Sequence, residues 1–495
     1  MNATYGVVAI TLVAIATIGI GAFGLRISRT TSDFYVASRS VSPVLNSSAI
    51  GGEYLSAASF LGVAGLVLAT GAEALWFPIG WTTGYLLLLV LVAAPLRRSG
   101  AYTIPDFAQV RLQSGAVRTV ASFLVVAVGW LYLMPQFQGA GLTMRTVTGA
   151  PGWVGTVLVA LIVMVNVVSG GMRSITFVQA FQYWLKLTAL LIPVFFLLHA
   201  WTSDGSPSPV APSDWVQPFG APDAESMYRI YSVMIATFLG TMGLPHVVVR
   251  FYTNPDGRAA RRTTLLVLAL LGVFYLLPTI YGVLGRIYAG DLLAEGRADA
   301  VVLELPARML GGSSGELLGA LLTAGAFAAF LSTSSGLTMS IAGVVGQALS
   351  HRPGMSNITA IRLAAVGGVI VPLLLALSAD RIAVASSVTF AFALAASTFC
   401  PLLVLGIWWR GLTAPGAIVG LVGGGLCAGV APVITIWTHP GGWFGLLAET
   451  PAAWSVPVGF ALMIGVSLAT RHRLPGDVSR TMVRLHAPEG VDLKR

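Results

Sequence analysis

Long apolar segments, each of about the length that crosses a lipid bilayer, follow one another along almost the whole chain. A spanning helix needs about 20 predominantly apolar residues. A scan on that basis predicts thirteen spans, at residues 5–25, 45–70, 75–96, 118–143, 152–170, 175–199, 229–250, 263–287, 315–347, 360–378, 383–406, 412–437 and 452–470. The segments are continuously apolar, with no alternation at every second residue, which indicates helices and not a β-barrel. The chain is therefore predicted to be an all-α polytopic membrane protein.

Charge is too scarce for a chain of this length to fold in water. Charged residues make up 9% of the 495 residues, against roughly 25% in soluble domains. A soluble enzyme, a fibrous protein, a disordered chain and a disulfide scaffold are all excluded on this ground. The two cysteines, Cys400 and Cys427, lie in apolar runs, so neither a disulfide framework nor a metal site is expected from them.

The distribution of basic residues predicts the orientation. The formal net charge is +9. With the N-terminus outside, 21 of the 28 basic residues fall on the cytoplasmic side and 6 on the outer side, while Lys186 lies within a helix. The positive-inside rule then predicts an outer N-terminus and a cytoplasmic C-terminus in a cell (inner or plasma) membrane. Topology accounts for the net charge, so the lipid bilayer is the expected partner, and neither nucleic acid nor an obligate protein partner is inferred.

Two ionisable residues, Glu53 and Lys186, sit well within predicted spans. A charge at the centre of a spanning helix costs roughly 2.5–3.5 kcal/mol, so such residues are functional candidates. Two structural alternatives stay open. Lys186 could extend its ammonium toward an interface, and Glu53 could be a buried carboxylate bonded to backbone or hydroxyl groups.

Two spans carry residues that disfavour a continuous helix. In NSSAIGGEYLSAASFLG the break is expected over residues 46–52, and in ATFLGTMGLPHVVVRF over residues 240–245. Broken helices at membrane depth free backbone carbonyls that line cavities or bind ions, although small residues also permit close helix packing. The two spans lie five apart, which predicts two five-helix repeats of inverted topology with a site at the midplane.

The predicted organisation follows from these repeats, because no segment leaves room for a folded soluble domain. It comprises a leading helix and loop at 1–44, a first repeat at 45–199, an extracellular loop at 200–228, a second repeat at 229–406, two further helices at 407–470 and a cytoplasmic tail at 471–495.

A cluster of hydroxyl side chains lies in the ninth span, in the run AAFLSTSSGLTMS. Its members are Ser332, Thr333, Ser334, Ser335, Thr338 and Ser340. Serine and threonine often bond back to their own helix, but hydroxyl oxygens are also ligands that a hard cation prefers. Composition leaves both interpretations open.

Three segments together resemble the sodium:solute symporter family. LNSSAIGGEYLSAASFLGVAG resembles the family's first core helix, and AAFLSTSSGL resembles its eighth. GTMGLPHVVVRFYTNPDGRAARRTT is similar to the sixth core helix and following loop of the cation/acetate symporter branch. With the span count, the resemblance covers essentially the whole chain.

The resemblance implies a LeuT-like fold of ten core helices, about thirteen transmembrane helices in all, and a sodium site. By motif, the implied ligands are the carbonyls of Ser47, Ile50 and Ala329 and the hydroxyls of Ser332 and Thr333. An acidic residue found on the fifth core helix of some sugar-transporting members is Gln179 here, and Lys186 follows two turns later. In proton-coupled or uncoupled relatives of the fold, a lysine near this site replaces the charge of the ion. Coupling to Na⁺ or to H⁺ therefore stays open, with Glu53, Gln179 and Lys186 as coupling candidates.

The function implied is symport of a small, acetate-like monocarboxylate with a cation by alternating access. The expected substrate contacts are Gly51, Gly52, Glu53 and Thr241, with Lys186 as the partner of the anion or of Glu53. A symporter for a larger monocarboxylate, proline or a sugar is the first alternative. An enzyme is disfavoured because the six histidines are scattered and no HExxH motif or carboxylate pair appears. A sensor or a channel is the third class considered.

Overall fold

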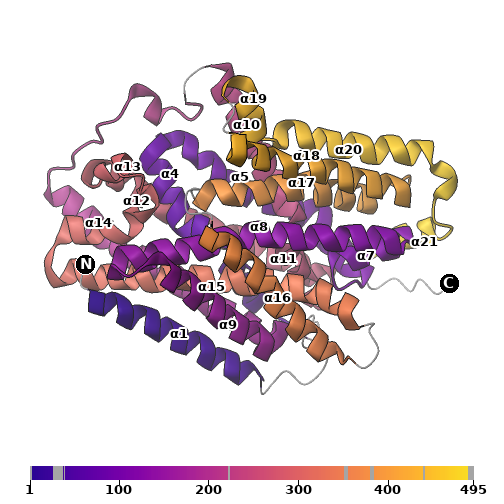
Figure 1. Cartoon of the computed structure of the whole chain (residues 1–495), viewed down its shortest axis with the longest axis horizontal. Helices are drawn as coiled ribbons and strands as arrows, with labels where there is room; N and C mark the ends of the chain where they lie inside the picture. The colour runs from indigo at the N-terminus through magenta and orange to yellow at the C-terminus, as the bar shows by residue number, and fades with distance from the viewer. Residues whose placement is uncertain are drawn as a thin grey trace.

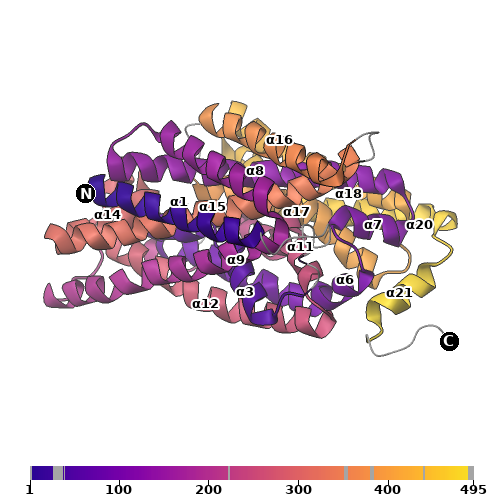
Figure 2. The same cartoon turned by 90° about the horizontal axis from the view of Figure 1, so that it is seen from below.

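A computed structural model describes residues 3–25, 37, 40–220, 223–350, 355–378, 384–438 and 441–488. Over these residues the chain is an elongated bundle of helices without β-strands, and most of the long helices run along its long axis (Figures 1 and 2). Eleven helical stretches are long and apolar enough to cross a membrane. The predicted all-α membrane architecture is confirmed.

The helices follow one another in this order. The first half holds α1 (Ala3–Leu25), α3 (Pro43–Tyr54), α4 (Val63–Thr70), α5 (Trp76–Leu87), α6 (Ala93–Ser99), α7 (Ile104–Leu112), α8 (Gly115–Thr148), α9 (Gly152–Ser203), α10 (Ala224–Gly243) and α11 (Pro245–Val249). The second half holds α12 (Gly257–Tyr288), α13 (Asp291–Ala294), α14 (Val301–Leu310), α15 (Gly312–Ser350), α16 (Asn357–Ser378), α17 (Val384–Trp408), α18 (Ala414–Thr438), α19 (Gly442–Glu449), α20 (Ala452–Ala469) and α21 (Val478–His486).

The two longest of the eleven stretches have more than twice the roughly 20 residues that one crossing needs. Ala58–Ser99 has 42 residues and Gly152–Ser203 has 52. The second contains a kink at Gly171, with φ 62° and ψ −174°, a conformation that is essentially restricted to glycine. The predicted spans 152–170 and 175–199 lie on either side of this residue. The total of thirteen crossings stays a prediction.

The first helix interruption lies later in the chain than predicted. Helix α3 continues through residues 46–52 and ends at Tyr54, and Leu55 leaves the helix with φ −74° and ψ 86°. The expected break over 46–52 is therefore wrong in position. The glycine pair packs closely instead, because a Cβ at Gly51 would meet the Tyr183 ring and one at Gly52 would collide with the backbone of α9.

The second interruption is confirmed where it was predicted. Helix α10 ends at Gly243, Leu244 is extended with φ −69° and ψ 118°, and α11 begins at Pro245. Proline at the first position of a helix loses no hydrogen bond, because its missing N–H would have no partner there.

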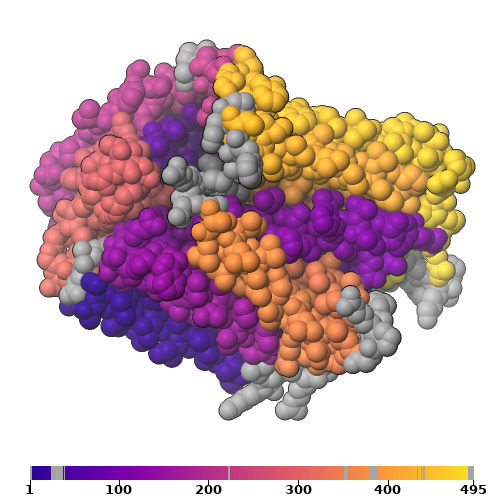
Figure 3. All heavy atoms as spheres, in the orientation of Figure 1, coloured from indigo at the N-terminus to yellow at the C-terminus, as the bar shows by residue number. Residues whose placement is uncertain are grey.

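The two broken helices are held by different neighbours. Helix α3 packs on α9, which in turn lies along α15, while α10 packs on α17 and α5. Helices α18 and α20 pack on each other and on α17. Figure 3 shows α1 and the α18–α20 group at opposite sides of one face, with α8 and α16 between them. Helices α1 and α21 lie toward opposite ends of the molecule (Figure 1), and the end that faces the cytoplasm stays a prediction.

Candidate functional site

Lys186 lies midway along the second half of α9, with its side chain fully buried. Its Nζ donates hydrogen bonds to the carbonyl oxygens of Gly52, at 2.5 Å, and Leu55, at 2.7 Å. A third hydrogen bond, of 3.0 Å, goes to Oγ of Ser332 on α15. The ammonium therefore joins the broken end of α3 to α15.

The carbonyls at the end of α3 can accept hydrogen bonds from other helices because α3 stops at Tyr54. The last four C=O groups of an α-helix have no partner within the helix. The carbonyl of Gly51 still accepts from Leu55 N, at 3.1 Å, whereas the carbonyls of Gly52 and Leu55 accept from Lys186 and that of Glu53 accepts from Thr333 Oγ1, at 2.6 Å. Local chain geometry thus turns a helix end into a set of buried acceptors.

The structure brings together the α15 residues of the predicted cation site but not the predicted residues of α3. Ser332 Oγ donates to the carbonyl of Ala329, at 3.0 Å, so these two residues and Thr333 lie at the break. Ser47 and Ile50 lie earlier, inside continuous α3. Lys186 instead links Ser332 to the carbonyls of Gly52 and Leu55. These two residues are three positions apart, as Ser47 and Ile50 are, and each lies five positions later in the chain.

Glu53 pairs with Arg250 instead of Lys186. Arg250 Nε lies 2.6 Å from Glu53 Oε2, and the side chains are 1% and 3% exposed. Arg250 also donates to Thr176 Oγ1, at 2.9 Å, and to Gln179 Oε1. Gln179 Nε2 in turn donates to the carbonyl of Ser332, at 2.8 Å. The network links α3, α9, α15 and the chain after α11.

Arg250 is one of the 21 basic residues predicted to lie on the cytoplasmic side, and its buried role was not predicted. Arg250 ends the apolar run PHVVVRF, directly after a helix interruption. A basic residue at the end of a span usually sets topology. Its position next to a predicted helix break was the one signal of a buried role.

Aromatic side chains fill the space between the two helix interruptions. We call this group the aromatic cage; its members are Tyr54, Trp81, Tyr85, Tyr132, Tyr275 and Phe392, and all are buried. Tyr54 packs edge-on against Tyr85 with ring centroids 4.8 Å apart, and Trp81 lies 5.7 Å from Tyr275. Phe392 of α17 contacts Trp81 at 5.9 Å and Tyr132 at 5.7 Å.

Polar groups in the aromatic cage are only partly paired. Tyr54 OH and Thr241 Oγ1 are 2.7 Å apart, which places the predicted substrate contact Thr241 beside the cage, and Ser59 Oγ lies 2.9 Å from Tyr275 OH. Trp81 Nε1 and Tyr85 OH are buried without a hydrogen-bond partner among the described residues. Most buried donors are paired, so these two are suited to a ligand with acceptor oxygens.

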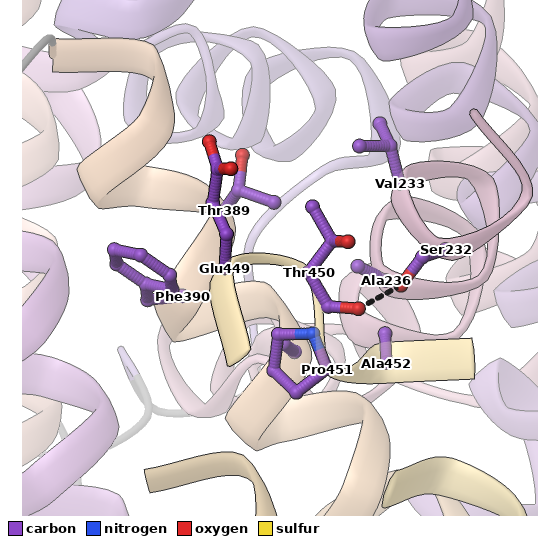
Figure 4. Close-up of a pocket in the computed structure, with 10 residues that line it drawn as sticks. Ser232, Val233, Ala236, Thr389, Phe390, Glu449, Thr450, Pro451 and Ala452 are labelled. Atoms are coloured by element: carbon purple, nitrogen blue, oxygen red, sulfur yellow. Dashed lines mark hydrogen bonds between the residues drawn. The ribbon is translucent and has the colours of Figure 1, made fainter. Parts of the chain in front are cut away.

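Two cavities outside this site do not fit a polar solute. Figure 4 shows one between α10, α17 and residues 449–452, where Ser232 Oγ donates to the carbonyl of Thr450 at 2.6 Å. Its volume of about 10 Å³ has room for one water at most. The other measures about 200 Å³ and is lined mainly by apolar groups around Val67, Leu75 and Val283. The aromatic cage is the better candidate because it holds the unpartnered donors Trp81 Nε1 and Tyr85 OH.

Comparisons with known proteins agree with this architecture. The sodium:solute symporter family matches residues 34–424. The uncharacterized symporter YwcA of Bacillus subtilis (strain 168) is 30% identical over 523 residues, covering 100% of both chains. A Na⁺-coupled sialic acid symporter in a substrate-bound outward-open state superposes with a TM-score of 0.69 at 15% identity, covering 93% of this chain and 98% of that one.

A second solved structure is Mhp1, a nucleobase-cation-symport-1 family transporter in a closed conformation with bromovinylhydantoin bound. It superposes with a TM-score of 0.53 at 14% identity, covering 92% of this chain and 99% of that chain. At these identities the likeness concerns the fold alone. The predicted LeuT-like fold is confirmed.

Proposed function

Because the chain belongs to the sodium:solute symporter family and is a multi-pass symporter, we propose that it imports a small, acetate-like monocarboxylate together with a cation. The observation that carries the proposal is the pair of unpartnered donors, Trp81 Nε1 and Tyr85 OH, in the aromatic cage between two helix interruptions. Such a site at the meeting point of two broken helices is typical of alternating-access carriers. A cell membrane is the proposed location.

The chemistry of the cage suits a small anion. A carboxylate offers several acceptor sites to N–H and O–H donors, and the edges of aromatic rings are electropositive. The nearby carboxylate of Glu53 is bound to Arg250, so its repulsion of an incoming anion is offset. We propose Trp81, Tyr85 and Thr241 as direct contacts.

The predicted contacts Gly51 and Gly52 take a supporting role in this proposal. They allow α9 to approach α3, and the carbonyl of Gly52 binds Lys186. The cation pocket that we propose consists of the carbonyls of Gly52 and Leu55 together with Ala329, Ser332 and Thr333 of α15, and three of its oxygen atoms accept hydrogen bonds from Lys186 in this structure. A cation held there stabilises the contact between α3 and α15, and its coupling to solute binding is expected to be about 1–3 kcal/mol.

An uptake panel in proteoliposomes tests the substrate class. Labelled acetate, propionate, pyruvate, proline and a hexose are compared under defined sodium and proton gradients. We expect saturable uptake of the short monocarboxylates. Saturable uptake confined to proline or the hexose would reject the monocarboxylate and favour the alternative substrates.

A pair of tryptophan variants tests the binding site. Trp81→Phe keeps an aromatic ring and removes one donor. A hydrogen bond to a charged group contributes about 1.5–3 kcal/mol, so the half-saturating acetate concentration should rise roughly 10- to 100-fold. Trp153→Phe, at a side chain that is 60% exposed, is the matched control and should leave uptake unchanged. An equal effect of both variants would contradict the proposed site.

A further inference from the structure

We propose that the outer face of α21 is a docking surface for an anionic phospholipid, at the end of the bundle that is predicted to face the cytoplasm. The helix holds its apolar face against the protein and turns two arginines outward, where lipid phosphate groups bind them. The inference goes beyond the proposed transport activity and holds whichever solute is carried.

Helix α21 is fixed to the bundle by one of its faces. Met482 and Leu485 are buried, and the helix packs on α6 and α17. Arg98 of α6 donates hydrogen bonds to the carbonyls of Leu485, at 3.4 Å, and His486, at 3.3 Å. These carbonyls lie in the last turn of α21, where they have no partner within the helix. The rest of the protein therefore sets the orientation of α21.

The position of α21 corresponds to the level of the membrane surface. Helix α6 ends at Ser99 and α17 ends at Trp408, and each of these residues is also the last residue of a candidate membrane span. A third candidate span, α20, leads into α21 through a short turn at Arg471–Arg473. Figure 2 shows α21 at the same end of the molecule as α6 and α7. A helix that packs at the ends of two spans lies where lipid headgroups lie.

The outer face of α21 carries two arginines and one apolar side chain. Residues three and four positions apart are neighbours on a helix surface, so Val483 and Arg484 both lie beside Arg480. All three side chains are exposed, that of Val483 by 47%. An amphipathic helix with a basic outer face of this kind is typical of helices that lie in the headgroup region of a membrane.

The charges of these two arginines are not neutralised by the protein. Within the residues that the structure describes, neither Arg480 nor Arg484 forms an ion pair. Asp477 is the one acidic residue of segment 471–488, and its charge interacts with Arg111. Like charges four residues apart destabilise a helix, and Arg480 lies in the first turn, where the helix dipole disfavours a cation. An anion bound between the two arginines offsets both effects.

The neighbouring side chains favour a lipid over a soluble anion. Trp408 is 48% exposed, and its ring lies 4.8 Å from that of His486 between centroids. Tryptophan is enriched at the level of lipid headgroups. Leu474, in the turn before α21, is also exposed. A soluble phosphate gains nothing from these apolar groups, whereas a bilayer covers them.

The arrangement of the arginines is more specific than topology requires. The positive-inside rule accounts for basic residues on this side of the membrane, but not for their alignment on one face of a helix. The guanidinium group presents its donors in a planar fork that matches a phosphate. The cytoplasmic leaflet is the one that carries anionic lipid, so the two arginines lie on the side where such a partner is present.

Hydrogen exchange of the full-length protein in lipid nanodiscs tests the proposal. We expect the amides of α21 to exchange more slowly in phosphatidylglycerol than in phosphatidylcholine. High salt should remove the difference, because it screens interactions between exposed charges. Arg480→Gln/Arg484→Gln should abolish the lipid dependence. Arg258→Gln/Arg262→Gln is the matched control: it removes two exposed arginines with the same spacing at the start of α12 and should keep the lipid dependence.

A titration of the lipid composition gives the magnitude. The measured quantity is the fraction of phosphatidylglycerol, in phosphatidylcholine, at which the protection of α21 is half-maximal. A basic residue near an anionic membrane surface strengthens binding about fivefold. Arg480→Gln and Arg484→Gln should therefore each raise this fraction about fivefold, and the control variant should leave it unchanged.

Three results would overturn the proposal. Equal exchange of α21 in the two lipids would exclude an anionic lipid and leave the arginines to an acidic protein. An equal loss in the α21 and α12 variants would show that net charge alone matters. The same protection from soluble glycerol phosphate in phosphatidylcholine nanodiscs would assign the surface to a soluble anion. Because no solute is present in these measurements, they leave the proposed function to its own tests.

Discussion

Removing Arg250 should destabilise the protein far more than removing an exposed arginine. In Arg250→Met, the carboxylate of Glu53 loses a partner at 2.6 Å while it remains buried, and Thr176 and Gln179 lose a donor as well. Leaving one charge of a buried pair without its partner costs about 3–5 kcal/mol. Glu53→Gln leaves the guanidinium without a counter-charge and should cost a similar amount.

The double variant Glu53→Gln/Arg250→Met removes both charges. Its cost should fall short of the sum of the single costs by about 2 kcal/mol or more, since neither residue leaves a charge behind. Unfolding free energies come from titration of the purified protein with SDS in mixed micelles, followed by circular dichroism. Arg308→Met is the control, because Arg308 pairs with Asp291 and Glu304 at the surface, where water screens the interaction.

Two outcomes would refute this reasoning about the ion pair. If the single costs simply add in the double variant, Glu53 and Arg250 do not depend on each other. If Arg250→Met is as mild as Arg308→Met, the guanidinium does not stabilise a buried carboxylate in the folded protein.

Two further predictions concern packing and pH. Gly52→Ala should abolish uptake and reduce folded yield, because its Cβ would collide with the carbonyl oxygen of Gln179. Gly429→Ala is the control and should be neutral, because a Cβ there meets nothing within 4 Å. Normal uptake by the Gly52 variant would contradict the close packing. Asp223 caps α10 by accepting a hydrogen bond from the backbone N–H of Ser226, and this bond lowers the pKa of Asp223 from its ordinary 3.8. The cap therefore contributes its full stability above pH 3.8. That stability is lost as the pH falls through the lower pKa of the folded state. The protection of backbone amides at the start of α10, which is the exchange rate compared with the intrinsic rate at the same pH, should therefore fall in acid, and Asp223→Ala should remove that dependence.

Features that depend on local composition could be predicted from the sequence. The apolar runs are long enough to predict an all-helical membrane fold, and scarce charge made Glu53 and Lys186 the ionisable residues to examine. Both lie in one buried region of the structure, on α3 and α9. The hydroxyl pair Ser332–Thr333 lies against the end of α3, and its role as a cation ligand stays a prediction.

Features that depend on distant contacts could not be predicted. Serine and glycine have low helix propensity, so residues 46–52 looked like the break, yet packing on α9 keeps them helical and the chain leaves the helix at Leu55. The partner of Glu53 lies 197 residues away. Apart from the helix break that precedes it, Arg250 looks like a basic residue that sets topology, and only the folded chain brings it to Glu53.

The glycine pair allows Lys186 to reach the oxygen atoms at the end of α3. Carbonyl and hydroxyl oxygens attract a metal cation and an ammonium alike, so the intact Ala-x-x-Ser-Thr run of α15 specifies the shape of a cation pocket and not its occupant. Lys186 reaches that pocket across 146 residues of sequence from Ser332, and it does so because a Cβ is absent where α3 meets α9. Residues that composition marked as helix breakers thus bring the amine within hydrogen-bonding distance. A larger residue at Gly52 would separate the two helices and withdraw Lys186 while leaving every oxygen of the motif in the sequence, so the contact between α3 and α9 determines whether the pocket holds an ammonium.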